Sequence, residues 1–236
     1  MLILTINPGS TSTKIALFEN LELVVKETVR HSQKTLVTFD ELTDQLDMRK
    51  KVIDKFLKKN NIKTEQIDGF IGRGGLIHPV KSGIYKVNEK MLDDLSNNTF
   101  GEHASNLGGI IAYEMAKTVG KDAYIADPVV VDEMSSVAKI SGLNGISRRS
   151  LWHALNQKAV ARKYAEKYGK KYEELNLIVA HLGGGISVGL HKRGRVTDVN
   201  NALDGDGPFS PERSGSLPVE SVIDLAFSGQ YTREQL

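Results

Sequence analysis

Two glycine-containing turns, each placed after an apolar run, have the residue types that hold phosphate. In the first, INPGSTSTK, a single glycine precedes four hydroxyl residues and a lysine. In the second, HLGGGISV, three glycines follow one another. Glycine lets backbone N–H groups approach an anion closely, and hydroxyl and lysine side chains add donors. The residues assigned to phosphate on these grounds are Gly9, Ser10, Thr11, Ser12, Lys14, Gly183, Gly184 and Gly185.

Neither turn is one of the common nucleotide-binding motifs. A P-loop requires a second glycine before its lysine, and none precedes Lys14. The pattern G-x-G-x-x-G is not completed after Gly183. The alternative for the glycine triplet is a flexible turn that holds no ligand. It is the occurrence of two such turns, rather than either alone, that indicates phosphate.

The elements around these turns predict an α/β protein. Short apolar runs bounded by turn residues predict strands at Leu2–Ile6, Ile15–Phe18, Leu21–Val29, Gly69–Ile71 and Ala123–Ala126. Apolar residues at helical spacing predict helices at 42–57, Ala104–Val119, Ser150–Tyr168 and Val219–Phe227. Because strands and helices alternate along the chain, the predicted class is α/β.

The two turns occupy matching positions of an internal repeat. From Asn176 onward the chain repeats the opening order of strand, glycine turn, strand, short turn and strand. Two such meanders predict two like domains facing each other across a cleft, 1–149 and 150–236; the alternative is coincidence between common β-meanders. Only residues 202–236 follow the second copy, so we expect the second domain to be incomplete in this chain.

Composition excludes several classes of function. The chain has 31 basic and 29 acidic residues and a net charge of +2, which gives no surface for nucleic acid or an anionic membrane. No apolar run is long enough to span a bilayer. Absence of cysteine excludes disulfides and thiol chemistry. With no basic flank before the short first run, we expect no signal peptide and a cytoplasmic location.

Seven motifs in order carry a specific resemblance. They are INPGSTSTK, GRGG, EHASNLGG, ADPVVVDE, SRRSLWHALNQKAVAR, HLGGGISV and DGDGPFSPERSG, and they extend from Ile6 to Gly215. Together they resemble the butyrate kinases, in the acetate kinase branch of the actin and hexokinase superfamily. The resemblance implies two actin-like, ribonuclease H-like domains and a homodimer. It implies reversible transfer of a phosphoryl group from ATP, with Mg²⁺, to a short-chain carboxylate, giving an acyl phosphate.

The chemistry of such a transfer favours arginine. A carboxylate is ionised at neutral pH and needs no strong base, so the difficulty is to bring two anions together. Arg73, between glycines at a strand end, and Arg213, in a Pro/Ser/Gly loop, match arginines that contact the acyl or phosphoryl group in the resembled family. Asp127 and Asn7, also at strand ends, are implied near Mg²⁺ or the phosphates. The alternatives are surface arginines and Asx-type turns.

The resemblance also assigns roles to several histidines. His181 is implied at the second phosphate turn, and His103 and His153 on the substrate side. The family's second histidine beside His153 is replaced here, and we assign Arg149 as its replacement. The remaining histidines, His31, His78 and His191, are interpreted as ordinary polar residues. Two interpretations are open for the acidic residues Asp204, Asp206 and Glu212: one of them contacts the metal ion, or all three belong to a solvated loop.

Three alternative functions are open at this point. A sugar kinase of the same superfamily needs a base to accept a hydroxyl proton, and paired arginines argue against it. A non-catalytic nucleotide-binding module, or an inactive fragment, is the second. The third is acetate or a branched-chain acid as substrate, since a methylene is worth only about 1–3 kcal/mol in a pocket. The resemblance places the adenine pocket after Leu236, so we expect no measurable activity and at best weak ATP affinity from these 236 residues alone.

Overall fold

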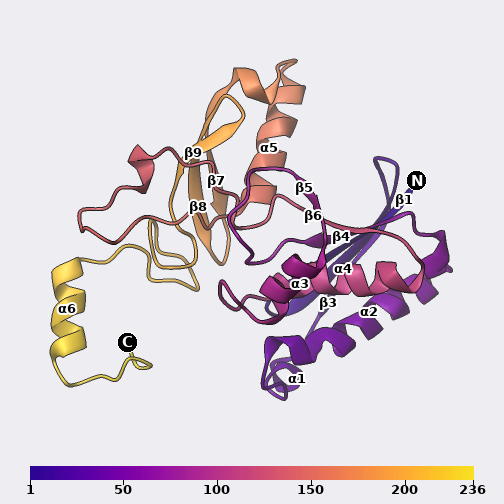
Figure 1. Ribbon diagram of the computed structural model, residues 1–236, viewed down its shortest axis with the longest axis horizontal. Helices are drawn as coiled ribbons and strands as arrows, with labels where there is room; N and C mark the ends of the chain where they lie inside the picture. The colour runs from indigo at the N-terminus through magenta and orange to yellow at the C-terminus, as the bar shows by residue number, and fades with distance from the viewer. The chain divides into compact units, whose positions relative to one another are not determined.

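The computed structural model describes residues 1–236, and they form two compact units, Met1–Val131 and Asp132–Leu236. Each unit is described by itself (Figure 1). Residues 132–149 belong to the second unit, where Ser135 N donates to Thr197 O at 2.9 Å. The predicted domain boundary between residues 149 and 150 is inferred from the internal repeat, and it stays a prediction. No helix in the structure is long and apolar enough to cross a membrane.

The first unit is built on a six-stranded mixed sheet in the order β3-β2-β1-β4-β6-β5. The strands are β1 Leu2–Pro8, β2 Ser12–Glu19, β3 Glu22–Arg30, β4 Gly69–Arg73, β5 Ile84–Lys86 and β6 Ala123–Ala126. The first three form the predicted antiparallel meander, and β4 and β6 run parallel to β1. Carboxyl ends of parallel strands share one edge, which places Asn7, Arg73 and Asp127 at neighbouring strand ends.

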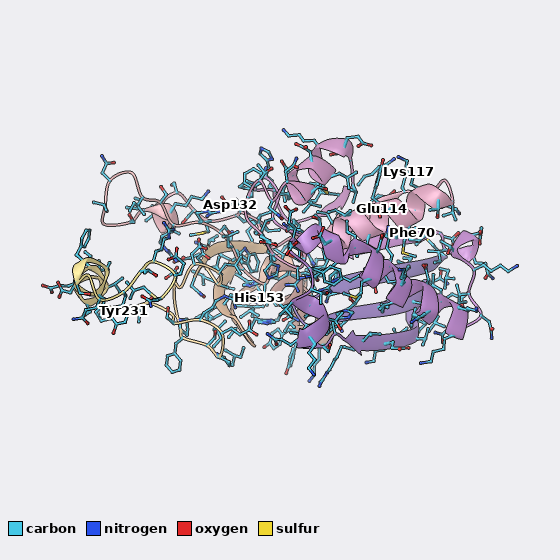
Figure 2. All side chains as sticks on the ribbon, turned by 90° about the horizontal axis from the view of Figure 1, so that it is seen from below. Phe70, Glu114, Lys117, Asp132, His153 and Tyr231 are labelled. Atoms are coloured by element: carbon cyan, nitrogen blue, oxygen red, sulfur yellow. The ribbon has the colours of Figure 1, made fainter.

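The first unit has four α-helices, α1 Gln33–Leu36, α2 Leu46–Lys59, α3 Glu89–Ser96 and α4 Asn106–Thr118, with short 3₁₀ turns at Leu42–Gln45 and Thr64–Gln66. Helices α2 and α4 pack on the sheet, α3 packs on α4, and the short α1 buries no residue. Ile53, Phe56 and Leu57 form the buried face of α2, as their spacing predicts, and Asn61 ends the helix region in a left-handed conformation. Figure 2 marks Phe70, fully buried on β4, and Glu114 on α4, the helix that packs against β4.

The contact between α4 and β4 depends on two facing glycines. A Cβ atom added at Gly72 would lie 2.1 Å from the Gly108 carbonyl oxygen, and one at Gly108 would lie 2.4 Å from the Arg73 carbonyl oxygen. The helix backbone therefore lies directly on the strand backbone. This close approach holds the backbone at the end of β4, and therefore Arg73, in a fixed position relative to α4.

The second unit contains the second predicted meander. Its strands β7 Asn176–Leu182, β8 Ile186–Lys192 and β9 Arg195–Val199 are antiparallel neighbours in that order. Its helices are α5 Ala154–Lys167 and α6 Val219–Phe227, with 3₁₀ turns at Val137–Lys139 and Tyr172–Glu174. As in the first meander, a register shift interrupts the pairing of the second and third strands. The internal repeat is confirmed at the level of strand order.

The predicted start of the long helix at Ser150 is wrong. Helix α5 begins at Ala154, and residues 150–153 are not helical. The Leu151 carbonyl oxygen accepts a hydrogen bond from Ala202 N at 2.8 Å, so this segment pairs with the loop after β9. His153 consequently lies at the helix N-terminus rather than inside the helix.

The glycine contact predicts a large effect of one methyl group. Gly72→Ala should lower the free energy of unfolding by roughly 3 kcal/mol, because the new Cβ overlaps backbone that cannot rotate away. The control is Gly69→Ala in the same strand, where the nearest atom to the added Cβ is 4.0 Å away, and it should change the value by under about 0.5 kcal/mol. Urea denaturation measures both; equal effects would contradict the packing described.

Candidate active site

The turn between β1 and β2 presents its backbone donors outward. Gly9 N donates to Ser12 O at 2.7 Å, which closes the turn. Ser10 and Thr11 are exposed, and their N–H groups have no protein partner in the structure. Lys14 is an exposed residue whose backbone pairs with Asn7 across the hairpin. The predicted phosphate residues of the first turn thus include two free backbone donors.

A buried arginine that sequence reasoning missed holds this turn from beneath. Arg49 on α2 has no exposed surface. Its Nη1 donates to Ser12 O and Thr13 Oγ1, both at 3.0 Å, and its Nη2 donates to Gly9 O at 3.0 Å. The guanidinium therefore binds the carbonyl oxygens that would repel a phosphate, and it adds a positive charge below the turn. Burial lowers the pKa of Arg49 to about 10, which leaves it charged at neutral pH.

His31 completes the support of the first turn. Its Nε2 lies 2.8 Å from Thr13 Oγ1, and its backbone N donates to Thr11 O at 2.8 Å. Burial and the neighbouring Arg49 charge lower the pKa of His31. His31, interpreted from the sequence as an ordinary polar residue, thus contacts the first turn and joins the end of β3 to it.

Two of the predicted strand-end residues meet in the first unit. Arg73 Nη1 lies 3.5 Å from Asn7 Oδ1, a long hydrogen bond that joins the ends of β4 and β1. Burial lowers the pKa of the Arg73 guanidinium, although an arginine stays protonated at neutral pH. A partly buried cation with one weak amide partner is well suited to bind an anion, because little solvent must be removed from it.

Asp127 occupies a strained position immediately after β6. Its φ of 37° lies in the left-handed region, which is uncommon for a residue with a side chain. The carboxylate is buried, and its Oδ1 accepts hydrogen bonds from Ser82 Oγ at 2.6 Å and Gly83 N at 2.9 Å. These two donors and the Gly83 carbonyl, which accepts from Asp127 N at 2.9 Å, fix its orientation.

His103 lies just before α4, bound to its N-terminal residues. Ser105 N donates to His103 Nδ1 at 3.2 Å, and the Ser105 hydroxyl lies 2.7 Å from the same nitrogen. The ring is therefore oriented by the start of the helix. Its predicted role on the substrate side stays a prediction.

The turn between β7 and β8 repeats the arrangement of the first turn with different donors. Gly183 N donates to Gly185 O at 3.2 Å, and the Ser210 hydroxyl donates to Gly184 O at 2.6 Å. A Cβ atom at Gly185 would lie 2.5 Å from Arg213 Nη1 and 3.4 Å from His153 Cε1. The predicted residues Gly185, Arg213 and His153 therefore meet at this turn, and only glycine leaves room for the two side chains.

The two predicted histidines of this unit lie against each other. The rings of His153 and His181 are stacked, with centroids 3.8 Å apart and planes inclined by 9°. His181 Nδ1 lies 3.0 Å from Asn156 Oδ1, and His153 Nδ1 lies 2.9 Å from Ser187 Oγ. Two like cations in such a stack would repel, so the geometry favours at most one protonated ring.

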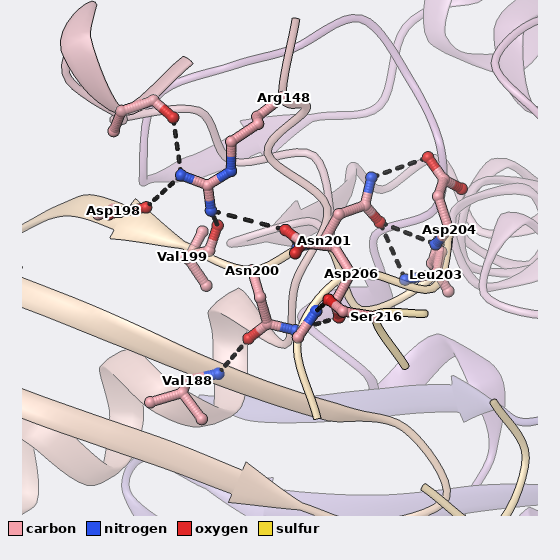
Figure 3. Close-up of polar contacts among 12 residues, drawn as sticks. Arg148, Val188, Asp198, Val199, Asn200, Asn201, Leu203, Asp204, Asp206 and Ser216 are labelled. Atoms are coloured by element: carbon pink, nitrogen blue, oxygen red, sulfur yellow. Dashed lines mark hydrogen bonds and ion pairs between the residues drawn. The ribbon is translucent and has the colours of Figure 1, made fainter. Parts of the chain in front are cut away.

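The loop that carries Arg213 is fixed by a second missed arginine. Arg148 donates to Asp198 Oδ1 at 2.9 Å and to Val199 O at 3.1 Å, and it lies 3.5 Å from Asp206 Oδ2 (Figure 3). Asn200 links Val188 to the same loop by donating to Asp206 O at 3.0 Å. This network ties residues 198–206 to β8 and β9.

Arg149 is engaged away from the second turn, whereas Glu212 lies at it: a Cβ atom at Gly184 would lie 2.7 Å from Glu212 Oε1. Arg149 Nη1 lies 3.6 Å from Asp204 Oδ2, and more than half of its side chain is exposed. Asp206 accepts from Asn201 N at 3.1 Å, and Glu212 lies 3.8 Å from Arg213 Nη1. No group of three or more His, Cys, Asp or Glu side chains is arranged to hold a metal ion. Arg149 is thus not among the residues that the structure gathers at the second turn.

A buried polar cluster lies below the second turn and was also missed. Gln157, His191 and Ser187 have no exposed surface, and Lys158 is 1% exposed. Lys158 forms an ion pair with Glu133 at 2.8 Å. Burial, with the Lys158 charge nearby, lowers the pKa of His191 to about 4. The signal for this cluster was present in the sequence, because Gln157 and Lys158 interrupt the apolar side of an alanine-rich helix.

Comparison with known proteins gives clear relatives. No protein-family model matches the chain. It is 56% identical over 234 residues to butyrate kinase 2 of Clostridium acetobutylicum, and 55% identical over 234 residues to butyrate kinase 1 of that organism. Both alignments cover 99% of this chain and 66% of the relative, so the chain spans just under two thirds of their length.

Solved structures agree on the fold. The crystal structure of Porphyromonas gingivalis acetate kinase matches with a TM-score of 0.74 at 18% identity, covering 99% of this chain and 66% of the other. The acetate kinase of Entamoeba histolytica matches with a TM-score of 0.71 at 18% identity, covering 99% and 63%. The α/β fold with its mixed sheet is therefore that of the acetate kinases.

The role of Arg49 predicts a specific loss of stability. Arg49→Met should lower the free energy of unfolding by roughly 3 kcal/mol or more, because two carbonyls and a hydroxyl lose their buried donor. Arg49→Lys should recover only part, since one ammonium cannot reach all three acceptors. The control is Lys59→Met on the same helix, which removes one surface ion pair with Glu27 and should cost under about 1 kcal/mol. Urea denaturation compares the three; similar losses for Met at both positions would contradict the assignment.

The buried histidine predicts acid sensitivity. The pKa of His191 is about 4 in the folded chain against 6.5 ordinarily, so the unfolded chain binds the extra proton first. Its contribution to stability should be complete above about pH 6.5 and decline as the pH falls toward about 4, by on the order of 3 kcal/mol. Unfolding free energies of the protein and of His191→Gln, measured between these limits, test this. A parallel pH dependence in both would show that His191 is not responsible.

Proposed function

This chain belongs to the butyrate kinase group of the acetokinase family, and from that premise we propose that it transfers the γ-phosphoryl group of ATP to butyrate, reversibly giving butyryl phosphate and ADP. The observation that carries the proposal within the structure is Arg73. It is a partly buried cation at a strand end, with one weak partner in Asn7. The acyl-chain preference rests on the relatives rather than on a residue of this chain, and a homodimer stays a prediction.

The donors of both turns suit a polyphosphate. Ser10 and Thr11 offer backbone N–H groups above the Arg49 charge. At the second turn, Arg213 and His153 lie beside Gly185, and His181, stacked on His153, lies beside Gly183. In each turn a carbonyl oxygen accepts a hydrogen bond from a side chain of this protein. This hydrogen bond reduces the repulsion between the carbonyl oxygen and phosphate oxygens.

The residues at the strand ends fit a magnesium ion bound with ATP. Mg²⁺ prefers hard oxygen ligands and is commonly held by one or two carboxylates together with substrate phosphates. Asp127 offers a carboxylate whose orientation is fixed, and Asn7 offers an amide oxygen. When bound, the ion would neutralise charge on the phosphate oxygens.

The proposed roles follow from the charges. The butyrate carboxylate attacks the phosphorus atom as an ionised nucleophile, the bond to the ADP oxygen breaks, and no proton is transferred. Arg73 would bind the carboxylate or the transferring group, and Arg213 would bind the transferring phosphoryl oxygens. A base for a sugar hydroxyl is not required, and Asp127 already accepts two hydrogen bonds through Oδ1.

An acyl-phosphate trapping assay tests the proposal. Hydroxylamine converts the acyl phosphate to a hydroxamate, which is measured with ATP, Mg²⁺ and butyrate, acetate or glucose. The assay is run on the 236-residue chain and on a form extended to the full length of its relatives. We expect hydroxamate with butyrate in at least the extended form. ADP formation with glucose, or no product from any carboxylate in either form, would overturn the proposal.

The proposed role of Arg73 predicts a kinetic signature. Arg73→Ala, in the active form, should lower turnover roughly 10²-fold or more, because a preoriented charge at the reacting group is lost. Arg73→Lys should restore only part, since an ammonium lacks the two-pronged geometry of guanidinium. Both are compared by kcat and KM for butyrate, with Arg195→Ala, an exposed arginine at the start of β9, as a control that should leave both constants unchanged. Near-normal kcat and KM in Arg73→Ala would show that Arg73 serves another purpose.

A further inference from the structure

We infer that Gln157 and Ser187 are positioning residues that determine which ring nitrogen of His153 carries its proton. An unbroken series of hydrogen bonds leads from the 3₁₀ turn at Tyr172–Glu174, through strand β8 and helix α5, to this histidine. Its members, in order, are Tyr172, His191, Gln157, Ser187 and His153. Each donor in the series can be assigned from the chemistry of its neighbour.

The donor and acceptor roles in the series are determined at the Ser187 backbone carbonyl. One terminal atom of the Gln157 amide lies 2.9 Å from Ser187 O and 2.7 Å from Ser187 Oγ. A carbonyl oxygen can only accept, so this atom is the NH₂ group, and it donates one hydrogen to each oxygen. The Gln157 amide therefore has a single orientation consistent with its contacts.

The other side of the amide determines the state of His191. Gln157 Oε1 lies 2.9 Å from His191 Nε2, so that nitrogen must carry a hydrogen. The second ring nitrogen, Nδ1, lies 2.6 Å from the Tyr172 hydroxyl and accepts from it in the neutral ring. Burial lowers the pKa of His191, in agreement with a neutral ring. His191 thus holds the amide in its orientation.

The Ser187 hydroxyl determines whether His153 Nδ1 donates or accepts a hydrogen bond. Its oxygen has three polar neighbours: Gln157 Nε2 at 2.7 Å, His153 N at 3.4 Å and His153 Nδ1 at 2.9 Å. The first two are donors, so the one hydroxyl hydrogen can only be donated to His153 Nδ1. Ser187 has no exposed surface, and water cannot take that hydrogen instead. His153 Nδ1 is therefore an acceptor, and the neutral ring carries its hydrogen on Nε2.

The consequence concerns the second turn. His153 Cε1, the ring carbon between the two nitrogens, lies close to Gly185, beside Arg213 Nη1. A fixed Nε2–H makes His153 a hydrogen-bond donor there without adding a second charge beside the arginine. This step rests on the proposed function, in which the donated hydrogen goes to a phosphoryl oxygen; the tautomer assignment does not.

Nitrogen NMR of the histidine rings tests the tautomer on the chain itself, with no substrate. In the wild-type protein at neutral pH we expect His153 Nδ1 unprotonated and Nε2 protonated, by roughly tenfold or more. Gln157→Glu reverses the series once its carboxyl group is ionised: a carboxylate can only accept, so the Ser187 hydroxyl turns toward it and His153 Nδ1 must become a donor. We expect Nδ1 protonated in this variant at a pH above the pKa of the new carboxyl group, which burial raises. Protonated Nδ1 in the wild-type protein would overturn the inference.

Two further variants test whether the shift of the His153 proton is caused by the reversed hydrogen bonds, by the added charge or by misfolding. Asn156→Asp introduces the same amide-to-acid change one residue earlier on α5, outside the series, and should leave His153 Nδ1 unprotonated. If it protonates Nδ1 as Gln157→Glu does, charge alone is responsible and the inference fails. Ser187→Ala removes only the hydroxyl and should reduce the preference for the Nε2–H form several-fold, with the β7–β9 amide spectrum retained; an unchanged preference would also overturn the inference.

Turnover distinguishes this inference from the proposed function. In the active form, Gln157→Glu should lower kcat roughly 10-fold or more with KM for butyrate little changed, because binding of the acid does not involve His153's proton. A tautomer shift with unchanged kcat would remove the assignment of His153 to the transferring group and leave the positioning role intact. No tautomer shift would overturn the positioning role whatever the activity.

Discussion

Both glycine turns share one constraint: their carbonyl oxygens are hydrogen-bonded within the chain, as the proposed binding of an anion by the turns' N–H groups requires. In the first turn, the Arg49 guanidinium binds the Gly9 and Ser12 carbonyls. In the second, the Ser210 hydroxyl binds the Gly184 carbonyl, and Gly183 N closes the turn onto Gly185 O. The two meanders therefore repeat strand order and turn closure but not the side chain that supports the turn. An arginine below one turn adds charge, whereas a serine below the other adds none.

The support of each turn extends into its own unit. Arg49 stands on α2, and the parallel ends of β1, β4 and β6 bring Asn7, Arg73 and Asp127 to one edge. Backbone contact between Gly72 and Gly108 fixes the position of the end of β4 relative to α4. In the second unit the buried Gln157 cluster lies below the turn, and the Arg148 network anchors the loop that brings Arg213 to it. The chemistry of the site is thus placed by buried polar contacts as much as by apolar packing.

Sequence reasoning predicted the strands well, because short apolar runs between turn residues have few alternatives. It omitted β5, two of whose three residues are exposed and which is placed only by pairing with β6. It began α5 too early, because the bond from Ala202 to Leu151 joins segments distant in sequence. Arg49 could not be told from the lysines around it, since only burial distinguishes them. Gln157 could have been found: a polar residue on the buried side of α5, one helical turn after His153, is such a signal. Arg149, assigned as the replacement of the family's second histidine, lies 3.6 Å from Asp204, and its role on the substrate side stays a prediction.

The most direct measurement of the central claim is a backbone amide NMR titration of this chain with ATP and Mg²⁺. It detects weak binding and needs no turnover. The account predicts that the amide signals of Ser10 and Thr11, and those of Gly183–Gly185, shift as ATP is added, and that Arg49→Lys reduces the shifts at the first turn while leaving those at the second. Shifts confined to other surfaces, with both turns unchanged at saturating ATP, would contradict it.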